Sequence, residues 1–374
     1  MKIMSYLYKD VDETKWKYSK IDFGKINLLV GGTASGKSRL LNTIFSLGRF
    51  AVTKEFKSGS WDVTFEQGAN SYRWILESRT SDEGNIVVVD KIYDVTQSRE
   101  VQIVDRDQSK FYFNNKELPK LSKDETSVKL LMEEELIAPI YSGFASIRKR
   151  NFDLDALSMS CRIEAIPLQL IKDIEKKKDI KIVRHHDLSI NAVMYLLQNY
   201  FPAYYSEICN YYKSVFPFII DISVQHISQL NDKIEIPGKV PVFCIKERNV
   251  NEWISLDQLS SGMKKVLLIL TDIYLLPEGG IYLIDEYENS LGINAIEFLP
   301  TFLLDLEKNI QFFITSHHPY IINKIPVNNW YVFHRNGSEI IIKYGDELIS
   351  RLGKSKQAAF IKLINDPFYI KGTE

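Results

Sequence analysis

One short stretch, residues 31–38, restricts what this chain can fold into more than any other. It reads GGTASGKS and matches the pattern G-x-x-x-x-G-K-[ST]. An apolar run, residues 26–30, precedes it, and residues 39–45 after it have helical spacing. Strand, glycine-rich loop and helix in this order predict a phosphate-binding loop, in which backbone N–H groups surround the anion. The alternative is an ordinary glycine turn, and the flanking strand and helix argue against it.

Three parts of the loop have separate roles in this prediction. Gly31 and Gly36 allow backbone angles that turn amide N–H groups toward a β-phosphate. Lys37 adds a positive charge between the β- and γ-phosphates, and the Ser38 hydroxyl is placed to bind Mg²⁺. The residues expected to bind the phosphates are Gly31, Gly32, Thr33, Ala34, Ser35, Gly36, Lys37 and Ser38.

Two further apolar runs end in polar residues that suit the same chemistry. Residues 281–284 lead into Asp285 and Glu286, at the end of a strand where α/β sheets bind their ligands. We expect Asp285 to hold Mg²⁺ and Glu286 to orient and polarise an attacking water; a solvated acidic turn is the alternative. Residues 311–316 lead into His317, which would reach a γ-phosphate held by neighbouring strands. A lone histidine after a strand is more often structural, and we interpret His318 in that way.

Ser260, Ser261 and Gly262 precede a predicted helix over residues 263–276. Serines are common helix N-caps, and a cap alone is one interpretation. The same exposed N–H groups and hydroxyls also form an anion site. Lys264 and Lys265 place positive charge in the first turn, against the preference of the helix dipole, which a bound anion would explain.

The remaining segments outline one interrupted domain. Alternation of apolar and polar residues predicts an antiparallel meander over residues 61–115. The other expected elements are a strand or hairpin in 1–25, a helix in 124–137, a transition in 138–151, helices in 152–233, a strand at 240–246 that returns to the core, strands at 330–333 and 339–344, and a helix near 355–365. The predicted lobes are 1–150, a helical insertion at 151–235, and 236–374.

Composition excludes several classes of protein. A formal net charge of −1 argues against a protein that coats nucleic acid through its overall field. No apolar run approaches the roughly 18 residues that span a bilayer, and the N-terminal residues are polar, unlike a signal peptide. The three cysteines form neither a metal pattern nor an even-numbered disulfide set. We therefore expect a soluble cytoplasmic protein without a membrane partner.

In this order and spacing, the motifs resemble the ABC-type ATPase heads of the RecF, SMC and OLD-like group. The resemblance covers residues 24–48 and 255–325. Residues 31–38 look like Walker A, 259–265 like the signature, 281–286 like Walker B, 288–293 like the D-loop, and His317 like the switch histidine. It implies an α/β P-loop NTPase fold with an antiparallel β subdomain and a helical insertion, and it implies ATP and Mg²⁺ as cofactors.

The resemblance also implies an assembly. In that group two heads meet face to face, and each ATP lies between the Walker loops of one subunit and the signature serine of the other, here Ser260. A homodimer, or a larger multiple, is therefore expected. The nucleotide-binding residues implied in this way are Arg39, Ser260, Ser261, Gly262 and Asn289.

The chain departs from the group's pattern at three points. Ser261 stands where transporter ATPases usually have glycine, as is common in small OLD-like ATPases. Gly292 is followed by Ile293 and Asn294, where relatives often place a histidine before a proline. Residues 137–150, the expected Q-loop region, contain no glutamine, so another residue must serve or metal coordination differs. The Walker loop alone also resembles that of tRNA prenyltransferases and small kinases, which lack the other motifs.

Taken together, these features favour an ATPase that controls a separate effector, a nuclease or toxin, as sensor subunits of bacterial anti-phage systems do. The chain lacks the long arms of SMC proteins, and too few residues follow His318 for an OLD nuclease domain. The alternative is a RecF-like DNA-repair clamp. Its positive surface would be formed by Arg148, Lys149, Arg150, Lys176, Lys177, Lys178 and Arg184. A scaffold that binds ATP without turnover is a third interpretation, which the intact Glu286 argues against.

Overall fold

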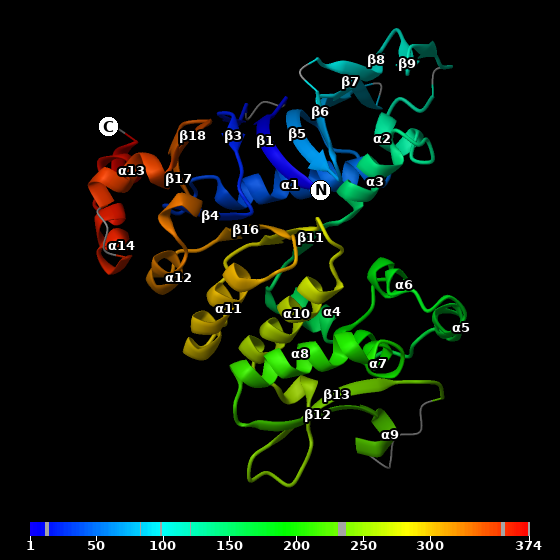
Figure 1. Cartoon of the computed structure of the whole chain (residues 1–374), viewed down its shortest axis with the longest axis vertical. Coiled ribbons are helices and arrows are strands. Elements are labelled where there is room, and N and C mark those ends of the chain that lie inside the picture. Colours follow the sequence, from blue (N-terminus) through cyan, green and yellow to red (C-terminus); the bar gives the residue numbers. More distant parts are fainter. Residues whose placement is uncertain are drawn as a thin grey trace. The chain divides into compact units, whose positions relative to one another are not determined.

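The computed structural model describes residues 1–11, 15–82, 84–97, 99–119, 121–230, 237–352 and 356–372 (Figure 1). The chain divides into two compact units. The first unit contains Met1–Arg150, Pro277–Tyr287 and Leu304–Glu374, and the second contains Asn151–Leu276 and Glu288–Leu303. The second unit thus includes residues 237–276, which the prediction assigned to the C-terminal lobe, while the predicted boundary between residues 235 and 236 lies outside the described residues.

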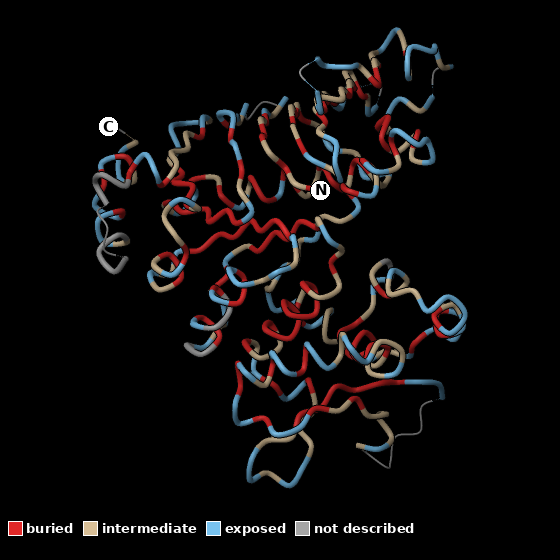
Figure 2. The backbone as a smooth tube through the Cα atoms, viewed as in Figure 1, coloured by how far each residue is buried: buried red, intermediate tan, exposed pale blue. Residues whose placement is uncertain are grey.

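Parallel strands form the centre of the first unit. β4 (Ile26–Gly31) pairs in parallel with β16 (Gln311–Thr315), β16 with β15 (Ile281–Ile284), and β15 with β11 (Ile147–Arg150). β17 (Trp330–Asn336) pairs in parallel with the other edge of β4. Every residue of β4, β15 and β16 is buried, as expected of parallel strands covered on both faces (Figure 2).

The predicted meander is present and extends the same sheet. The strand order is β10-β9-β8-β7-β6-β5-β1-β2-β18-β17-β4-β16-β15-β11, and β3 pairs with β1. The alternating side chains of β5 and β6 place Trp61 and Trp74 in a core that also contains Phe144, whose ring centroid lies 5.1 Å from that of Trp74. The additional strands of this sheet are β1 (Lys2–Lys9), β2 (Lys17–Tyr18), β3 (Ile21–Asp22), β5 (Gly59–Gln67), β6 (Asn70–Ser81), β7 (Gly84–Asp94), β8 (Val101–Asp107), β9 (Phe111–Phe113), β10 (Lys116–Glu117) and β18 (Glu339–Tyr344).

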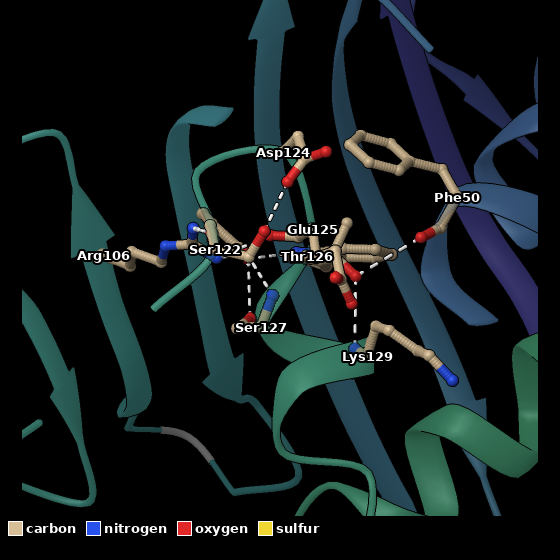
Figure 3. Close-up of polar contacts among 10 residues, drawn as sticks. Phe50, Arg106, Ser122, Asp124, Glu125, Thr126, Ser127 and Lys129 are labelled. Atoms are coloured by element: carbon tan, nitrogen blue, oxygen red, sulfur yellow. Dashed lines mark hydrogen bonds and ion pairs between the residues drawn. The ribbon is translucent and has the colours of Figure 1, made fainter. Parts of the chain in front are cut away.

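A buried polar network fixes the segment that leaves the meander (Figure 3). Asp90, fully buried, accepts hydrogen bonds from the Trp74 indole N–H and the Ser127 hydroxyl, both at 2.8 Å. Arg106 lies 3.8 Å from the Asp90 carboxylate and donates to the Ser122 and Glu125 carbonyl oxygens at 2.5 and 2.7 Å. Burial lowers the pKa of Arg106, while the charge of Asp90 opposes this shift. The network anchors the meander to the start of the helices that lead to β11.

The connection between the meander and β11 corrects two expectations. The predicted helix over 124–137 is reduced to α2 (Ser127–Leu130) followed by turns. The predicted transition over 138–151 contains α3 (Ala138–Ala145) and the strand β11. Pro139 explains the break, because proline is favoured in the first turn of a helix and cannot continue one that precedes it.

The second unit combines helices with a small sheet. The strands β12 (Ile219–His226), β13 (Pro241–Glu247) and β14 (Ile254–Ser255) pair in that order. The segment 152–233 was predicted to be mostly helical, and among its described residues the strand β12 is a correction to that prediction. The strand expected to return to the core, β13, pairs within this small sheet and not with the main one. The helices are α4 (Leu154–Ser160), α5 (Leu168–Lys177), α6 (Lys181–His185), α7 (Ile190–Tyr200), α8 (Pro202–Val215), α9 (Ile227–Leu230), the short η1 (Leu256–Gln258), α10 (Ser261–Leu275) and most of α11 (Ile293–Asp305).

The C-terminal segment completes the first unit. The expected strands at 330–333 and 339–344 are β17 and β18, and the helix expected near 355–365 is α14, although residue 355 lies outside the described residues. The helices of this unit are α1 (Lys37–Val52), α2, α3, α12 (Pro319–Lys324), η2 (Val327–Asn329), α13 (Gly345–Leu352), α14 (Lys356–Ile364) and α15 (Pro367–Lys371). Among the helices within the described ranges, none is both long and apolar enough to cross a bilayer.

Candidate functional site

The phosphate-binding loop lies between the end of β4 and the start of α1. Its last glycine, Gly36, is the N-cap of α1 and has a φ of 102°, a conformation that favours glycine. A Cβ atom at this position would also meet the side chain of Ile340 at 2.6 Å. The hydroxyl of Tyr18 donates to the Gly36 carbonyl oxygen at 2.9 Å. The backbone angle therefore favours glycine where the loop enters the helix, and a larger residue would also displace the end of the Ile340 side chain.

Lys37 is enclosed by the loop that it belongs to. Its ammonium group donates to the carbonyl oxygens of Gly31 and Gly32, both at 2.9 Å, and to the Ser35 hydroxyl at 3.3 Å. Only 5% of the residue is exposed. The positive charge is thus fixed inside the loop, beside the backbone N–H groups that would surround a phosphate.

The two predicted metal ligands are neighbours in the structure. Ser38 and Asp285 are 247 residues apart in sequence, and the Ser38 hydroxyl donates to Asp285 Oδ1 at 3.0 Å. Thr315, at the end of β16, donates to the same carboxylate oxygen at 2.6 Å. Mg²⁺ binds a few protein oxygens of this kind and fills its other positions with phosphate and water. A hydroxyl and a carboxylate at the edge of the phosphate loop fit this requirement.

Thr315 is a residue of the candidate site that the sequence analysis missed. Besides holding Asp285, its hydroxyl accepts a hydrogen bond from the backbone N–H of Glu286 at 2.7 Å. Its carbonyl oxygen accepts from the N–H of Tyr287 at 3.0 Å. Thr315 therefore holds the side chain of Asp285 and fixes the backbone at Glu286 and Tyr287. The only signal in the sequence was a hydroxyl at the end of a strand that precedes His317.

Glu286 occupies a strained turn immediately after β15. Its φ is 47°, in the left-handed region that few residues other than glycine adopt. Such conformations persist where surrounding contacts enforce them, and here Thr315 supplies those contacts. Glu286 is exposed, and so is His317, which follows the neighbouring parallel strand β16. The two predicted catalytic side chains thus belong to the same edge of the sheet.

His318 is structural, as expected. Its ring nitrogen Nδ1 accepts a hydrogen bond from the backbone N–H of Tyr320 at 3.3 Å, and the residue is the N-cap of α12.

Arg39 has partners outside the loop. Its guanidinium donates to Asp10 Oδ2 at 2.8 Å and stacks on the ring of Trp16, 4.2 Å from the ring centroid. The guanidinium of Arg335 lies at the same distance from that ring. These contacts hold Arg39 beside the N-terminal strands, and its contact with a nucleotide stays a prediction.

A cavity of about 320 Å³ adjoins the tip of the loop. It offers room for a ligand that extends beyond the phosphates. Its lining residues are Gly32, Thr33, Ala34, Ser35, Phe333, His334, Arg335, Tyr369 and Ile370.

The signature residues belong to the second unit. Ser260 is the N-cap of α10, and its hydroxyl accepts from the N–H of Met263 at 3.2 Å. A Cβ atom on Gly262 would collide with the carbonyl oxygen of Ser290, so the signature packs tightly against the D-loop. Ser260, Ser261, Gly262 and Asn289 therefore lie in one body of the chain, and the Walker residues lie in the other.

The two lysines of the signature helix do not require an anion. Lys264 donates to the carbonyl oxygen of Asp257, and Lys265 to that of Asn289, both at 2.9 Å. Lys265 also lies over the ring of Phe152, 4.4 Å from its centroid. These contacts account for the positive charge in the first turn without a bound anion, and an anion at this helix start stays a prediction.

The fold and the site of the first unit define a P-loop ATPase head of the ABC and SMC type. An SMC head solved with the C-terminal winged-helix domain of ScpA matches over 92% of this chain and 98% of its own, with 12% identity and a TM-score of 0.50. The SMC head of Thermotoga maritima matches over 92% and 99%, with 12% identity and a TM-score of 0.43. A comparison with curated proteins finds no match.

Residues 26–323 match the family described as an AAA domain, putative AbiEii toxin, Type IV TA system, and the chain belongs to that family. The predicted class, an ABC-type ATPase head of the RecF, SMC and OLD-like group, is confirmed. The predicted α/β P-loop NTPase fold is confirmed as well.

Proposed function

We propose that the protein binds and hydrolyses ATP with Mg²⁺ and does so at an interface between two copies of the chain. The observation that carries the proposal is the Asp285 carboxylate, which accepts hydrogen bonds from Ser38 after the phosphate loop and from Thr315 on the adjacent strand. Mg²⁺ held there would neutralise charge on the β- and γ-phosphates.

The roles of the chain's own residues follow from their contacts. Lys37 would exchange its hydrogen bonds to the loop carbonyls for phosphate oxygens, which are stronger acceptors because they are charged. Ser38 and Asp285 would hold the metal. Glu286, whose backbone is fixed by Thr315, would accept the proton of the attacking water, and His317 would contact the γ-phosphate.

The dimer is supported by the division of the motifs between the two units. In the arrangement that the resemblance implies, Ser260 of one copy completes the site formed by the Walker residues of the other. Ser260 is exposed, as a residue that contacts a second chain must be in the monomer. The same arrangement makes hydrolysis depend on assembly.

The biological role that we propose is control of a separate effector, a nuclease or toxin, in anti-phage defence. The family description, which includes a putative toxin and a type IV toxin–antitoxin system, supports this role. The ATP-dependent change between monomer and dimer would be the signal that the effector reads.

The test measures mass by light scattering with and without ATP and Mg²⁺, for the wild type and for Glu286→Gln. Removing the general base should trap ATP, so Glu286→Gln should dimerise with ATP and hydrolyse it at least about a hundredfold more slowly than the wild type. Lys37→Ala, which should not bind ATP, is the control that stays monomeric. Unchanged mass for every protein would refute ATP-dependent assembly. In that case Ser260→Arg distinguishes two explanations. It abolishes hydrolysis if the protein is a permanent oligomer, and it leaves hydrolysis unchanged if one chain completes the site alone.

A further inference from the structure

The edge strand β11 brings a basic side chain to the metal side of the site. It pairs in parallel with β15, with Lys149 opposite Leu283 and Arg150 opposite Ile284. The carboxyl ends of the two strands therefore meet at one edge of the sheet, where Asp285 follows β15. β4, β15 and β16 are apolar through most of their length, whereas β11 carries three consecutive cations at this edge.

Lys149 is connected to the metal ligands through one face of α1. Its ammonium group donates to Asn42 Oδ1. Asn42 follows Ser38 by four residues, so both project from the same face of the helix. Ser38 in turn donates to Asp285. The ammonium group is thus held about one helical turn from the hydroxyl that would bind the metal.

The surroundings of Lys149 suit an anion that arrives from outside. Its hydrogen-bond acceptor at Asn42 is a neutral amide oxygen. The group is half-buried, and burial lowers its pKa, while the charge of Asp285 opposes that shift. Holding an ammonium group partly out of water costs free energy, which the Asp285 charge offsets only in part. A bound phosphate beside Asp285 would offset this cost.

We propose that Lys149 is a further residue of the nucleotide site, whose ammonium group binds the γ-phosphate side of ATP and competes with the metal there. The proposal rests on ATP binding at the site described above. It assigns a residue to the segment 137–150, which contains no glutamine.

The proposal has a signature that a structural lysine would not produce. Metal-free ATP carries two more negative charges than its Mg²⁺ complex, so a fixed cation stabilises bound metal-free ATP more strongly. Because the two binding steps are linked, the same cation must weaken Mg²⁺ binding to the ATP-bound protein by the ratio of its effects on metal-free ATP and on the Mg²⁺ complex. A cation beside the γ-phosphate in a partly hydrated site gives a factor on the order of ten.

The experiment measures ATP binding by titration calorimetry, once in EDTA and once in excess Mg²⁺, for the wild type and Lys149→Gln. Lys149→Gln should weaken ATP binding in EDTA about tenfold and in Mg²⁺ less than about threefold. It should also lower the Mg²⁺ concentration that half-saturates the ATP-bound protein. Lys149→Arg should resemble the wild type. Arg148→Gln is the matched control, because it removes the same charge from an exposed neighbour on the opposite face of β11 and should change neither affinity more than about twofold.

Equal weakening in EDTA and Mg²⁺ would overturn the proposal, because it would mean that Lys149 supports the fold or the loop. An unchanged ATP affinity in both buffers would overturn it as well, and would mean that Lys149 only holds Asn42 in place. Lys149→Met removes the same charge and keeps the aliphatic stem, so it provides the test if Lys149→Gln does not fold. A wild type that binds no ATP in either buffer would refute the proposed function itself.

Discussion

Replacing Thr315 by valine tests how the site is held together. The two side chains have nearly the same shape, so Thr315→Val removes a hydroxyl without opening a cavity. Thr315 is 1% exposed, and water therefore does not replace the lost partner without local rearrangement. The substitution leaves Asp285 without the 2.6 Å hydrogen bond and the N–H of Glu286 without its 2.7 Å acceptor.

The expected cost follows from these two contacts. A hydrogen bond to a charged group contributes about 1.5 to 3 kcal/mol, and a neutral one about 0.5 to 1.5 kcal/mol. Thr315→Val should therefore lower the free energy of unfolding by about 2 to 4 kcal/mol. Thr315→Ser keeps the hydroxyl and loses one buried methyl group, so it should cost only about 1 kcal/mol.

Urea unfolding followed by tryptophan fluorescence measures both costs, and the Mg²⁺ concentration that half-saturates the ATP-bound protein reports on the site. Thr315→Val should raise that concentration, because Asp285 and Glu286 lose the group that orients them, whereas Thr315→Ser should not. If the valine variant unfolds with the same free energy as the serine variant and binds Mg²⁺ equally well, Thr315 does not organise the site and the reasoning fails.

Two further predictions concern the rest of the fold. Asp90→Ala removes the buried carboxylate that Arg106, Trp74 and Ser127 contact, so it should lower the free energy of unfolding by about 3 to 5 kcal/mol in urea titrations, and a loss below about 1 kcal/mol would contradict the network. Burial raises the pKa of Cys209 to about 12 and that of Cys244 to about 11, so both thiols should stay protonated at pH 9 and react slowly with iodoacetamide in the native protein but rapidly in urea. Because these folded pKa values exceed the unfolded value near about 8.5, the stability that the protonated thiols contribute is present below that pH and is lost as the pH rises toward 11 and 12. If both cysteines are alkylated as rapidly in the native protein as in urea, this prediction is contradicted.

The central strands could be predicted because strands that are buried on both faces are rich in apolar residues. Residues 26–30, 281–284 and 311–315 are short runs rich in apolar residues, the pattern of parallel strands that are covered on both faces. The strand β11 escaped prediction because three of its four residues are cations, and its pairing with β15 depends on a partner far away in the sequence. Periodicity carries no signal for such a strand.

The candidate site was predictable wherever one local motif contains the chemistry. Ser38 and Asp285 were expected to meet at a metal, and the structure joins them by a hydrogen bond. Thr315 was missed because its role depends on a contact between strands. The carbonyl partners of Lys264 and Lys265 were missed for the same reason, since packing and not the helix itself determines which carbonyl groups they bind.

The boundary between the units separates two sets of motifs. It falls between Tyr287 and Glu288, directly after Walker B, so the D-loop belongs to the body that contains the signature. Two contacts join the D-loop to the signature. Gly262 packs against the Ser290 carbonyl oxygen, and Lys265 donates to the carbonyl oxygen of Asn289.

We therefore predict that one added methyl group in the signature abolishes dimerisation and leaves ATP binding by the Walker residues intact. Gly262→Ala would force the Ser290 carbonyl away from α10, although alanine is the better helix former by about 1 kcal/mol. If the signature acts on the ATP of a second copy, Gly262→Ala should keep ATP binding by calorimetry within about twofold and lose ATP-dependent dimerisation by light scattering. Gly24→Ala is the control, because a Cβ atom there would meet only ordinary contacts, the nearest at 3.8 Å. Loss of ATP binding by the Gly262→Ala monomer would refute the separation, since it would mean that the signature serves the site of its own chain.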